Sequence, residues 1–276
     1  MSLSMMREIR FRFNPSQEGY PRRSRGFIIR NAVNFIAVGR DLKLNWRMKI
    51  LFRSVFALAA LGGLCFCGCT STGLRNYQGK PFHDSVYHDG PQKIPGRVQC
   101  AYYDLGGEGV AYHDTDGTNN GSGKLNPANG TYLNEFRMNE GVDMSYTKFH
   151  DAIDNNPYNL VPPPERQIYV GWTVPGEWFN LTVEVEHAGV YVMDLLYTSN
   201  RGGTISLDRN GKPLVSAISI KSTRNEQEPV AWRQWHHWNV MTNLAEVELP
   251  KGVSVLTVHI VTEGNMNLAY LDFKPK

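Results

Sequence analysis

Residues 178–186 read Trp-Phe-Asn-Leu-Thr-Val-Glu-Val-Glu, and their pattern is the clearest indication of the fold class. From Phe179 onward, apolar side chains stand at every second position and polar side chains stand between them. Successive side chains of a β-strand point to opposite faces of the sheet. The alternation therefore predicts a strand with one face in the core and the other in water.

Similar short apolar runs recur on both sides of this strand, separated by turn residues. Asn210-Gly211 is the strongest turn signal, because this pair favours the tight turn of a β-hairpin. No stretch keeps the 3.6-residue period of a helix, so many short strands predict an all-β sandwich or jelly roll. The expected strands lie at 97–103, 169–172, 179–186, 190–197, 205–207, 247–249, 256–260 and 268–273.

The stretch 106–164 breaks this rhythm. It is long and rich in Gly, Asn, Asp and Pro. Loops of this length in a compact domain are usually functional or disordered.

The chain begins with a leader. Lys49 and Arg53 precede a short apolar run at 55–66, and small residues follow up to Cys69. This is the layout of a secretory signal peptide, and the run is shorter than the roughly 20 residues that span a bilayer. The exit Phe-Cys-Gly-Cys resembles the lipobox of bacterial lipoproteins, although Phe66 stands where Leu is usual. We expect a signal peptide over 48–68 and lipidation of Cys69, with an ordinary signal peptide or an uncleaved anchor as the alternative.

Residues 1–47 are basic and keep no apolar period. A signal peptide normally begins within a few residues of its apolar core, so Met48 is the expected true start. Residues 1–47 are then an unstructured upstream extension. A basic cytoplasmic tail, in line with the positive-inside rule, is the alternative.

Removing the leader reverses the sign of the net charge. The first 68 residues hold 12 of the 29 basic and 3 of the 26 acidic residues, which leaves 17 basic and 23 acidic, a net charge of −6. No basic surface is left for a phosphate backbone, which argues against nucleic acid as a partner. Cys100 is the only cysteine after Cys69, so no intramolecular disulfide forms within the folded part.

Signatures of enzymes are missing from the sequence. It holds no Gly-x-Ser-x-Gly elbow and no phosphate-binding loop. His236 and His237 are adjacent, so on a strand they would point to opposite faces and could not chelate one metal together. Asp114 and Asp116 form a carboxylate pair or part of a cation site, or else cap their own turn. We therefore expect no catalytic residues.

Tryptophan is frequent in the part after the leader. The ordinary role of each indole is core packing, which we expect for Trp178 at the start of its strand. Trp172 precedes the Pro175-Gly176 turn and Trp232 follows a polar loop, so both are expected at loop edges. An exposed indole can stack on the C–H face of a sugar ring while neighbouring polar groups bond its hydroxyls. The five tryptophans are Trp172, Trp178, Trp232, Trp235 and Trp238.

Residues 94–97, Ile-Pro-Gly-Arg, and 103–114, Tyr-Asp-Leu-Gly-Gly-Glu-Gly-Val-Ala-Tyr-His-Asp, resemble the opening of family 6 carbohydrate-binding modules. The resemblance is to the bacterial branch that is often joined to glycoside hydrolases, and it extends over 94–273. Each later match is short, but all of them occur in the family's order. They lie at 140–143, 170–172, 176–178, 189–191, 232–235, 249–252 and 266–268.

The resemblance implies a galactose-binding-like jelly-roll β-sandwich at 94–276, preceded by a linker over 69–93. It also implies a cleft in the loops at one edge, where two aromatic side chains clamp a sugar and an asparagine bonds it. By position in the motifs, these residues are Trp172, Trp232 and Asn267. A polar residue of the early loop completes the cleft, on or near His113 with Tyr112 and Asp114 beside it.

The family also commonly holds a structural calcium ion, with acidic ligands on its first strand and near the end of its last strand. Here those positions read Gln99-Cys100-Ala101 and Ala269. Calcium takes about six to eight oxygen ligands, carboxylates among them. We therefore expect calcium to bind weakly or not at all, and we expect no other metal or cofactor.

The expected function is non-catalytic binding of a poly- or oligosaccharide by an exported, lipid-anchored protein of the cell envelope or outer membrane. A glycoside hydrolase of the same system is a further expected partner. One alternative is a structural or adhesive envelope protein with the same fold and no open cleft. Another is a glycan-active hydrolase accessory. Trp172 and Trp232 distinguish sugar binding from the structural alternative, because binding requires them to be exposed and to face each other across a gap.

Overall fold

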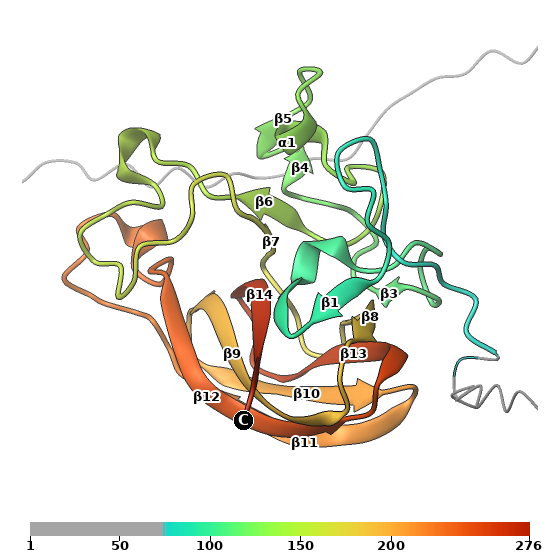
Figure 1. Ribbon diagram of the computed structural model, residues 1–276. Coiled ribbons are helices and arrows are strands. Elements are labelled where there is room, and N and C mark those ends of the chain that lie inside the picture. Colours follow the sequence, from blue (N-terminus) through green and yellow to red (C-terminus); the bar gives the residue numbers. More distant parts are fainter. Residues whose placement is uncertain (1–73, 75) are drawn as a thin grey trace, which may run out of the picture. The chain divides into compact units, whose positions relative to one another are not determined.

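A computed structural model describes residue 74 and residues 76–276 (Figure 1). The expected extension at 1–47, the signal peptide at 48–68 and the lipid site at Cys69 lie outside the described residues. Within that part of the chain, no helix is both long enough and apolar enough for a membrane crossing.

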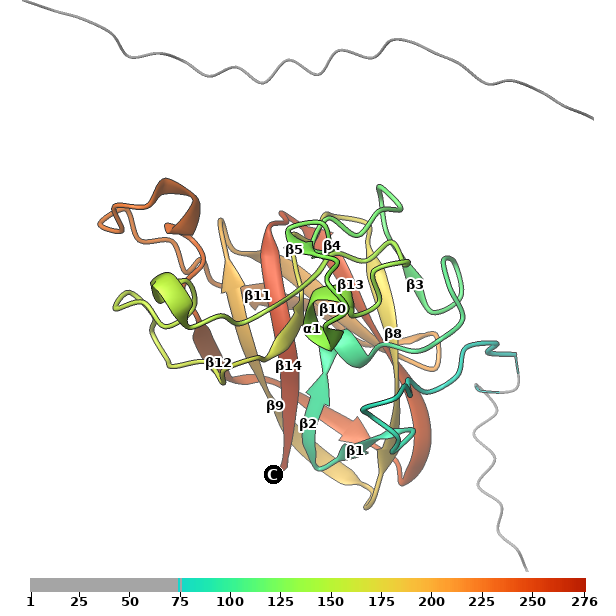
Figure 2. The ribbon, with the colours of Figure 1, turned by 90° about the horizontal axis from the view of Figure 1, so that it is seen from above.

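Two six-stranded sheets form a β-sandwich, as the sequence predicts (Figures 1 and 2). The first sheet has the order β1-β8-β13-β10-β11, with β3 beside β8. Its strands are β1 (Gln92–Ile94), β3 (Tyr112–His113), β8 (Trp178–Val185), β10 (Gly203–Arg209), β11 (Lys212–Ile220) and β13 (Gly252–Thr262).

The second sheet has the order β12-β9-β14-β7-β6, with β2 beside β14. Its strands are β2 (Gly96–Gln99), β6 (Met144–Tyr146), β7 (Ile168–Val170), β9 (Gly189–Ser199), β12 (Asn239–Leu249) and β14 (Met266–Pro275). All pairs in the two sheets are antiparallel except β1 with β8. The chain is thus an all-β jelly-roll sandwich.

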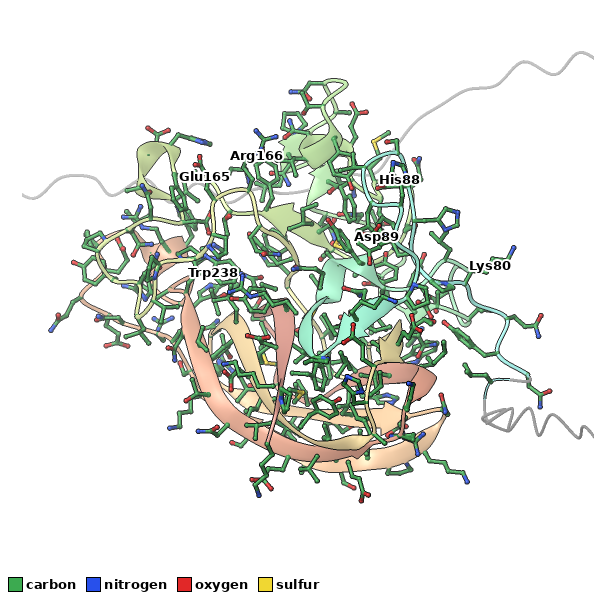
Figure 3. The ribbon with its side chains drawn as sticks, viewed as in Figure 1. Lys80, His88, Asp89, Glu165, Arg166 and Trp238 are labelled. Atoms are coloured by element: carbon green, nitrogen blue, oxygen red, sulfur yellow. The ribbon has the colours of Figure 1, made fainter. Side chains whose placement is uncertain are left out.

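The core lies between the sheets and takes side chains from both of them (Figure 3). Leu181 and Leu256 come from the first sheet, Leu195 and Phe273 come from the second, and all four are buried. Burying an aliphatic or aromatic side chain of this size contributes about 1.5–3 kcal/mol. Cys100 is the only cysteine among the described residues, where it is free and buried, and burial raises the pKa of its thiol.

The strand quoted first, β8, departs from its predicted pattern in one respect. Its polar face is buried at Asn180 and Thr182, whereas Glu184 on the same face stays partly exposed. Asp104 accepts the Thr182 N–H at 2.8 Å and the Thr182 hydroxyl at 2.6 Å, while the Asn180 amide donates to the Val110 carbonyl oxygen at 2.9 Å. The Tyr77 hydroxyl donates to the same carboxylate at 2.7 Å. These bonds satisfy the polar groups, so two positions predicted to face water can be buried instead.

The segment before residue 94 is also part of the domain. Phe82 is buried, with its ring 5.0 Å from that of Tyr102 and 5.6 Å from that of Phe136. The Lys80 backbone pairs with that of Leu105, and β1 joins the first sheet. The linker predicted over 69–93 is therefore wrong for residues 77–93, because their aromatic side chains pack on the sandwich.

The Asn210-Gly211 turn is confirmed. Arg209 pairs with Lys212 across a two-residue connection in which Asn210 and Gly211 have φ angles of 51° and 70°. Both values lie in the left-handed region that this hairpin turn requires.

The long stretch 106–164 is built of small elements at one end of the sandwich (Figures 1 and 2). Gly121 permits its close packing, since a Cβ there would lie 1.8 Å from the Met144 carbonyl oxygen. The elements after β3 are the paired strands β4 (Ser122–Gly123) and β5 (Asn126–Pro127), helix α1 (Tyr132–Glu135), strand β6 and the 3₁₀ turn η2 (His150–Ala152). Two further 3₁₀ turns lie elsewhere, η1 (Cys100–Tyr102) and η3 (Ala231–Arg233).

Candidate functional site

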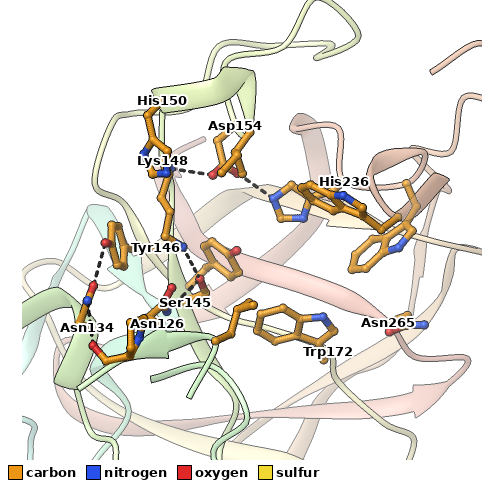
Figure 4. A pocket seen from close by; sticks show the side chains of 16 residues that line it. Asn126, Asn134, Ser145, Tyr146, Lys148, His150, Asp154, Trp172, His236 and Asn265 are labelled. Carbon is orange, nitrogen blue, oxygen red and sulfur yellow. Dashed lines mark hydrogen bonds and ion pairs between the residues drawn. The ribbon is translucent and has the colours of Figure 1, made fainter. Parts of the chain in front are cut away.

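A cavity of about 810 Å³ opens between the long stretch 106–164, the loop after β7 and the loop before β12 (Figure 4). Its volume lies within the range of roughly 300–1,000 Å³ that is typical of small-ligand sites. The aromatic side chains that line it are Tyr146, Tyr169, Trp172, Trp232 and Trp235. The polar and charged ones are Asn126, Asn134, Ser145, Lys148, His150, Asp154, His236 and Asn265.

Trp172 enters the cavity from the loop after β7. Its φ angle is 48°, a left-handed value that is rare for a bulky side chain. The Trp172 backbone N–H donates to Asn267 Oδ1 at 3.3 Å, which fixes this conformation. The residue before it must be small, because a Cβ on Gly171 would lie 3.0 Å from the same oxygen.

Trp232 stands on the turn η3 and is 57% exposed. Its neighbour Arg233 donates to both carboxylate oxygens of the fully buried Glu228, each at 3.0 Å, and to the Ala152 carbonyl oxygen at 2.7 Å. Bidentate pairs of this kind are strong and directional. The hydrogen bonds from Arg233 lower the pKa of the Glu228 carboxyl. This pair therefore holds the turn that presents Trp232.

A hydrogen-bonded chain forms the back of the cavity. Asp154 Oδ1 lies 2.7 Å from His236 Nε2 and accepts from Trp238 Nε1 at 2.7 Å. His236 Nδ1 lies 2.9 Å from Asn267 Nδ2. Asn267 Oδ1 already accepts from Trp172, so its amide nitrogen donates to Nδ1, and the ring proton is assigned to Nε2. Burial alone would raise the pKa of Asp154, but the hydrogen bonds that it accepts outweigh burial and lower it.

The structure brings two of the predicted binding residues together in one cavity, Trp172 and Trp232. It places Asn267 behind that cavity, where the side chain is fully buried and bonded to Thr198, His236 and the Trp172 backbone. No amide atom is left to meet a ligand. The predicted direct contact of Asn267 with a sugar is therefore corrected: Asn267 positions Trp172 and His236.

Tyr112, His113 and Asp114 do not line the cavity. They lie on β3 and just after it, and β3 pairs with β8 in the first sheet, whereas β6 and β7 beside the cavity belong to the second. Tyr112 is buried and its hydroxyl accepts from Gly141, while His113 contacts Glu108. Asp114 accepts the N–H groups of its own turn, as the turn-capping alternative predicts. Their predicted place in the cleft is corrected accordingly.

Several cavity residues carry no signal that the sequence could reveal. Tyr146, Lys148, His150 and Asp154 come from the long stretch 106–164, whose path follows from tertiary packing. The length and composition of this stretch indicated only that it could be functional, and not which of its residues line a site.

The structure also bears on the calcium site of the family that the sequence resembles. Gln99 Oε1 accepts from Gln167 Nε2 at 2.7 Å, and the Gln99 N–H donates to Gln92 Oε1 at 2.7 Å. Ala101 and Ala269 are buried and supply no side-chain oxygen. The residues therefore do not fit a calcium ion, which needs several oxygen ligands. Across the described part of the chain, no group of three or more His, Cys, Asp or Glu side chains is placed to hold a metal.

No family model and no curated protein matches the chain. Solved structures resemble parts of it. A family 35 carbohydrate-binding module from Clostridium thermocellum is 16% identical with a TM-score of 0.33, over 43% of this chain and 84% of that one. The family 6 module CBM6cm-2 of Cellvibrio mixtus lichenase 5A, in complex with cellotriose, is 18% identical with a TM-score of 0.31, over 40% and 78%.

A third similar structure is the isomalto-dextranase of Arthrobacter globiformis T6 in complex with panose. It is 15% identical with a TM-score of 0.32, over 42% of this chain. This chain spans about a fifth of the length of that enzyme, 20%.

Proposed function

We propose that this protein binds a poly- or oligosaccharide and catalyses no reaction on it. The observation that carries the proposal is one cavity lined by three indoles, Trp172, Trp232 and Trp235, among hydroxyl, amide and charged groups. Indole faces attract the C–H face of a pyranose, and the polar groups can bond its hydroxyls.

The carboxylates of the cavity favour binding over hydrolysis. Glycoside hydrolysis generally uses two carboxyl groups about 5–10 Å apart. Asp154 is the one carboxylate among the described residues that line the cavity. Its oxygens are occupied by bonds from His236, Trp238 and the Lys148 backbone. The described residues that line the cavity therefore supply no second carboxyl group for hydrolysis.

Exposure favours binding over a purely structural role. A structural or adhesive domain needs no open site, and its indoles would be packed. Trp232 is largely exposed and Trp172 is half-buried, and both border the same open volume.

We further propose a cellular setting that rests on the sequence alone. The protein is a lipoprotein related to family 6 modules, exported to the cell envelope or outer membrane and anchored through lipid on Cys69. Translation starts at Met48, and a glycoside hydrolase of the same system acts on the bound glycan. Lipid anchoring of many copies raises the avidity of a site whose single affinity is modest. Peptide mass spectrometry of the native protein tests the start and the lipid, and any peptide from 1–47 contradicts Met48.

Trp172→Ala and Trp232→Ala test the proposed function. A glycan array first identifies a ligand for the full chain in detergent, and calorimetric titration then compares the variants. Truncating an aromatic hot spot costs about 2 kcal/mol or more, so each variant should bind at least roughly 30-fold more weakly. Trp178→Ala is the matched control, because Trp178 is half-buried and does not line the cavity.

Thermal melting must show that the cavity variants stay folded. Unchanged affinity in both of them, or a loss in Trp178→Ala as large as theirs, contradicts the role of the cavity.

A further inference from the structure

Lys148 is the feature of the cavity that neutral sugar binding leaves unused. It follows β6, and its side chain runs through the cavity toward Ser145 (Figure 4). Its Nζ donates to Ser145 Oγ at 3.3 Å and lies 4.4 Å from the centre of the Tyr146 ring. Among the described residues, no carboxylate forms an ion pair with this ammonium group. A partly buried cation thus faces the cavity with no anion in contact.

The nearby carboxylate of Asp154 does not take that place. Its Oδ2 accepts the backbone N–H of Lys148 at 2.6 Å, and its Oδ1 is bonded to His236 and Trp238. Its side chain is only 1% exposed. A ligand in the cavity therefore meets the ammonium group of Lys148 and not the carboxylate of Asp154.

His150 adds a second basic group to the same wall. It lies two residues after Lys148, lines the cavity and makes no side-chain hydrogen bond to a described residue. This local basicity contrasts with the sequence after the leader, in which 23 acidic residues outnumber 17 basic ones. The ammonium charge of Lys148 is therefore opposite in sign to the net charge of residues 69–276.

We propose that the cavity selects an anionic saccharide, one that carries a uronate carboxylate or a sulfate ester, with Lys148 as its counter-charge. The inference rests on the proposed function and narrows its ligand class. Both anions accept hydrogen bonds from an ammonium group, and such charge-assisted bonds are about twice as strong as neutral ones. The aromatic walls reduce solvent screening, which strengthens the attraction further.

The state of Lys148 without ligand agrees with this role. Burial lowers the pKa of Lys148, in spite of the attraction of Asp154. The charged ammonium form of Lys148 is therefore unfavourable in the empty cavity. When an anion binds, the ion pair offsets the loss of hydration.

The experiment measures binding of charged and uncharged partners of the same sugar. The full chain in detergent is applied to an array of neutral and acidic glycans. Titration calorimetry then compares trigalacturonate with its methyl ester, and a κ-carrageenan tetrasaccharide with its desulfated form. The first pair reports a carboxylate and the second a sulfate. Variants are Lys148→Met, which keeps the apolar stem over Tyr146, and Lys148→Arg, which keeps the charge.

We expect one acidic probe to bind at least tenfold more tightly than its uncharged partner. Lys148→Met should abolish that difference, while Lys148→Arg keeps most of it. The matched control is Lys124→Met, because Lys124 is exposed, lies outside the cavity and has its ammonium group bonded to the Asn120 side chain.

Three results overturn the inference. If Lys148→Met keeps the wild-type preference, the charge that selects the ligand lies elsewhere. If neutral glycans bind as tightly as acidic ones on the array, the selection is absent while the proposed function stands. If no glycan of either charge binds, the proposed function fails and the inference fails with it.

Discussion

Asp143 shows how one residue beside β6 responds to its surroundings. Burial, together with the carboxylates of Asp114 and Asp116, raises the pKa of Asp143 to about 6. A hydrogen bond from the Asn120 N–H opposes that rise only in part. An unfolded chain titrates its aspartates near pH 3.9.

In the wild-type protein, the free energy of unfolding should fall between about pH 4 and pH 6. We predict that this fall is absent from the Asp143→Asn variant. In that interval the native carboxyl binds a proton that the unfolded chain releases, so the free energy of unfolding falls as the pH rises. The amide keeps an acceptor for Asn120 and cannot ionise. Urea denaturation should show equal stability of the two proteins near pH 4 and a more stable variant at pH 7. Parallel pH profiles contradict the raised pKa.

At this scale the sequence predicts residue identity better than orientation. Trp172 and Trp232 were found because each stands beside a turn or polar loop, and the structure places both at one cavity. Asn267 was found as a neighbour of that site, but its direction depends on Thr198 and His236, which are far from it along the chain. Lys148 carried no pattern at all.

The loop between β11 and β12 has its own internal support. Arg233 is 12% exposed at its side chain and Glu228 is fully buried, so their pair is shielded from solvent. The same arginine bonds Ala152, which connects this loop with the η2 turn. Breaking the pair therefore affects both walls of the cavity.

We predict that Arg233→Met destabilises the fold by about 3–5 kcal/mol, because it leaves a buried carboxylate without its partner. The double variant Arg233→Met with Glu228→Gln should recover much of this loss. Arg224→Met is the matched control on the same loop, since Arg224 contacts Glu226 in solvent and exposed pairs contribute about 0–1 kcal/mol. Chemical denaturation measures all three. An Arg233→Met variant as stable as the control contradicts a structural role of the pair.

Among the strands, the regular ones were predictable and the interrupted ones were not. β8, β9, β13 and β14 alternate or stay apolar over their length and appear where expected. Only the last residues of β12 were predicted. Its register shifts between Met241 and Ala245, where it pairs with β9, and this irregularity breaks the two-residue period.

The boundary of the whole domain differs from its prediction for a similar reason. The segment 77–93 has the composition of a linker, and its aromatic residues Tyr77, Phe82 and Tyr87 follow no period. Each one finds a partner in the folded domain, at Asp104, Phe136 and Tyr102. Composition could not reveal contacts that exist only after folding.

We predict that residues 94–276 form a much less stable domain than residues 76–276. Removing the buried Phe82 alone corresponds to a loss of about 3–5 kcal/mol, and β1 loses two of its three residues. Thermal melting of the two fragments measures the difference. Equal melting temperatures would show that the segment 77–93 adds nothing to stability.

We also predict that calcium does not stabilise the domain. Gln99 stands where the family that the sequence resembles places a calcium ligand, and it is bonded to the amide groups of Gln92 and Gln167. A chelator should therefore leave the melting temperature of the protein unchanged, and added calcium should not raise it. A large drop on chelation contradicts this prediction.

Three of the five tryptophans in the described part of the chain line the cavity, and the other two, Trp178 and Trp238, lie outside it. Occupation of the cavity displaces water from the exposed indole of Trp232, whereas the indole of Trp238 is already fully buried. The protein therefore carries its own optical reporter. Its ultraviolet emission should shift to shorter wavelength as a ligand fills the cavity, so a fluorimeter can screen unlabelled candidates directly.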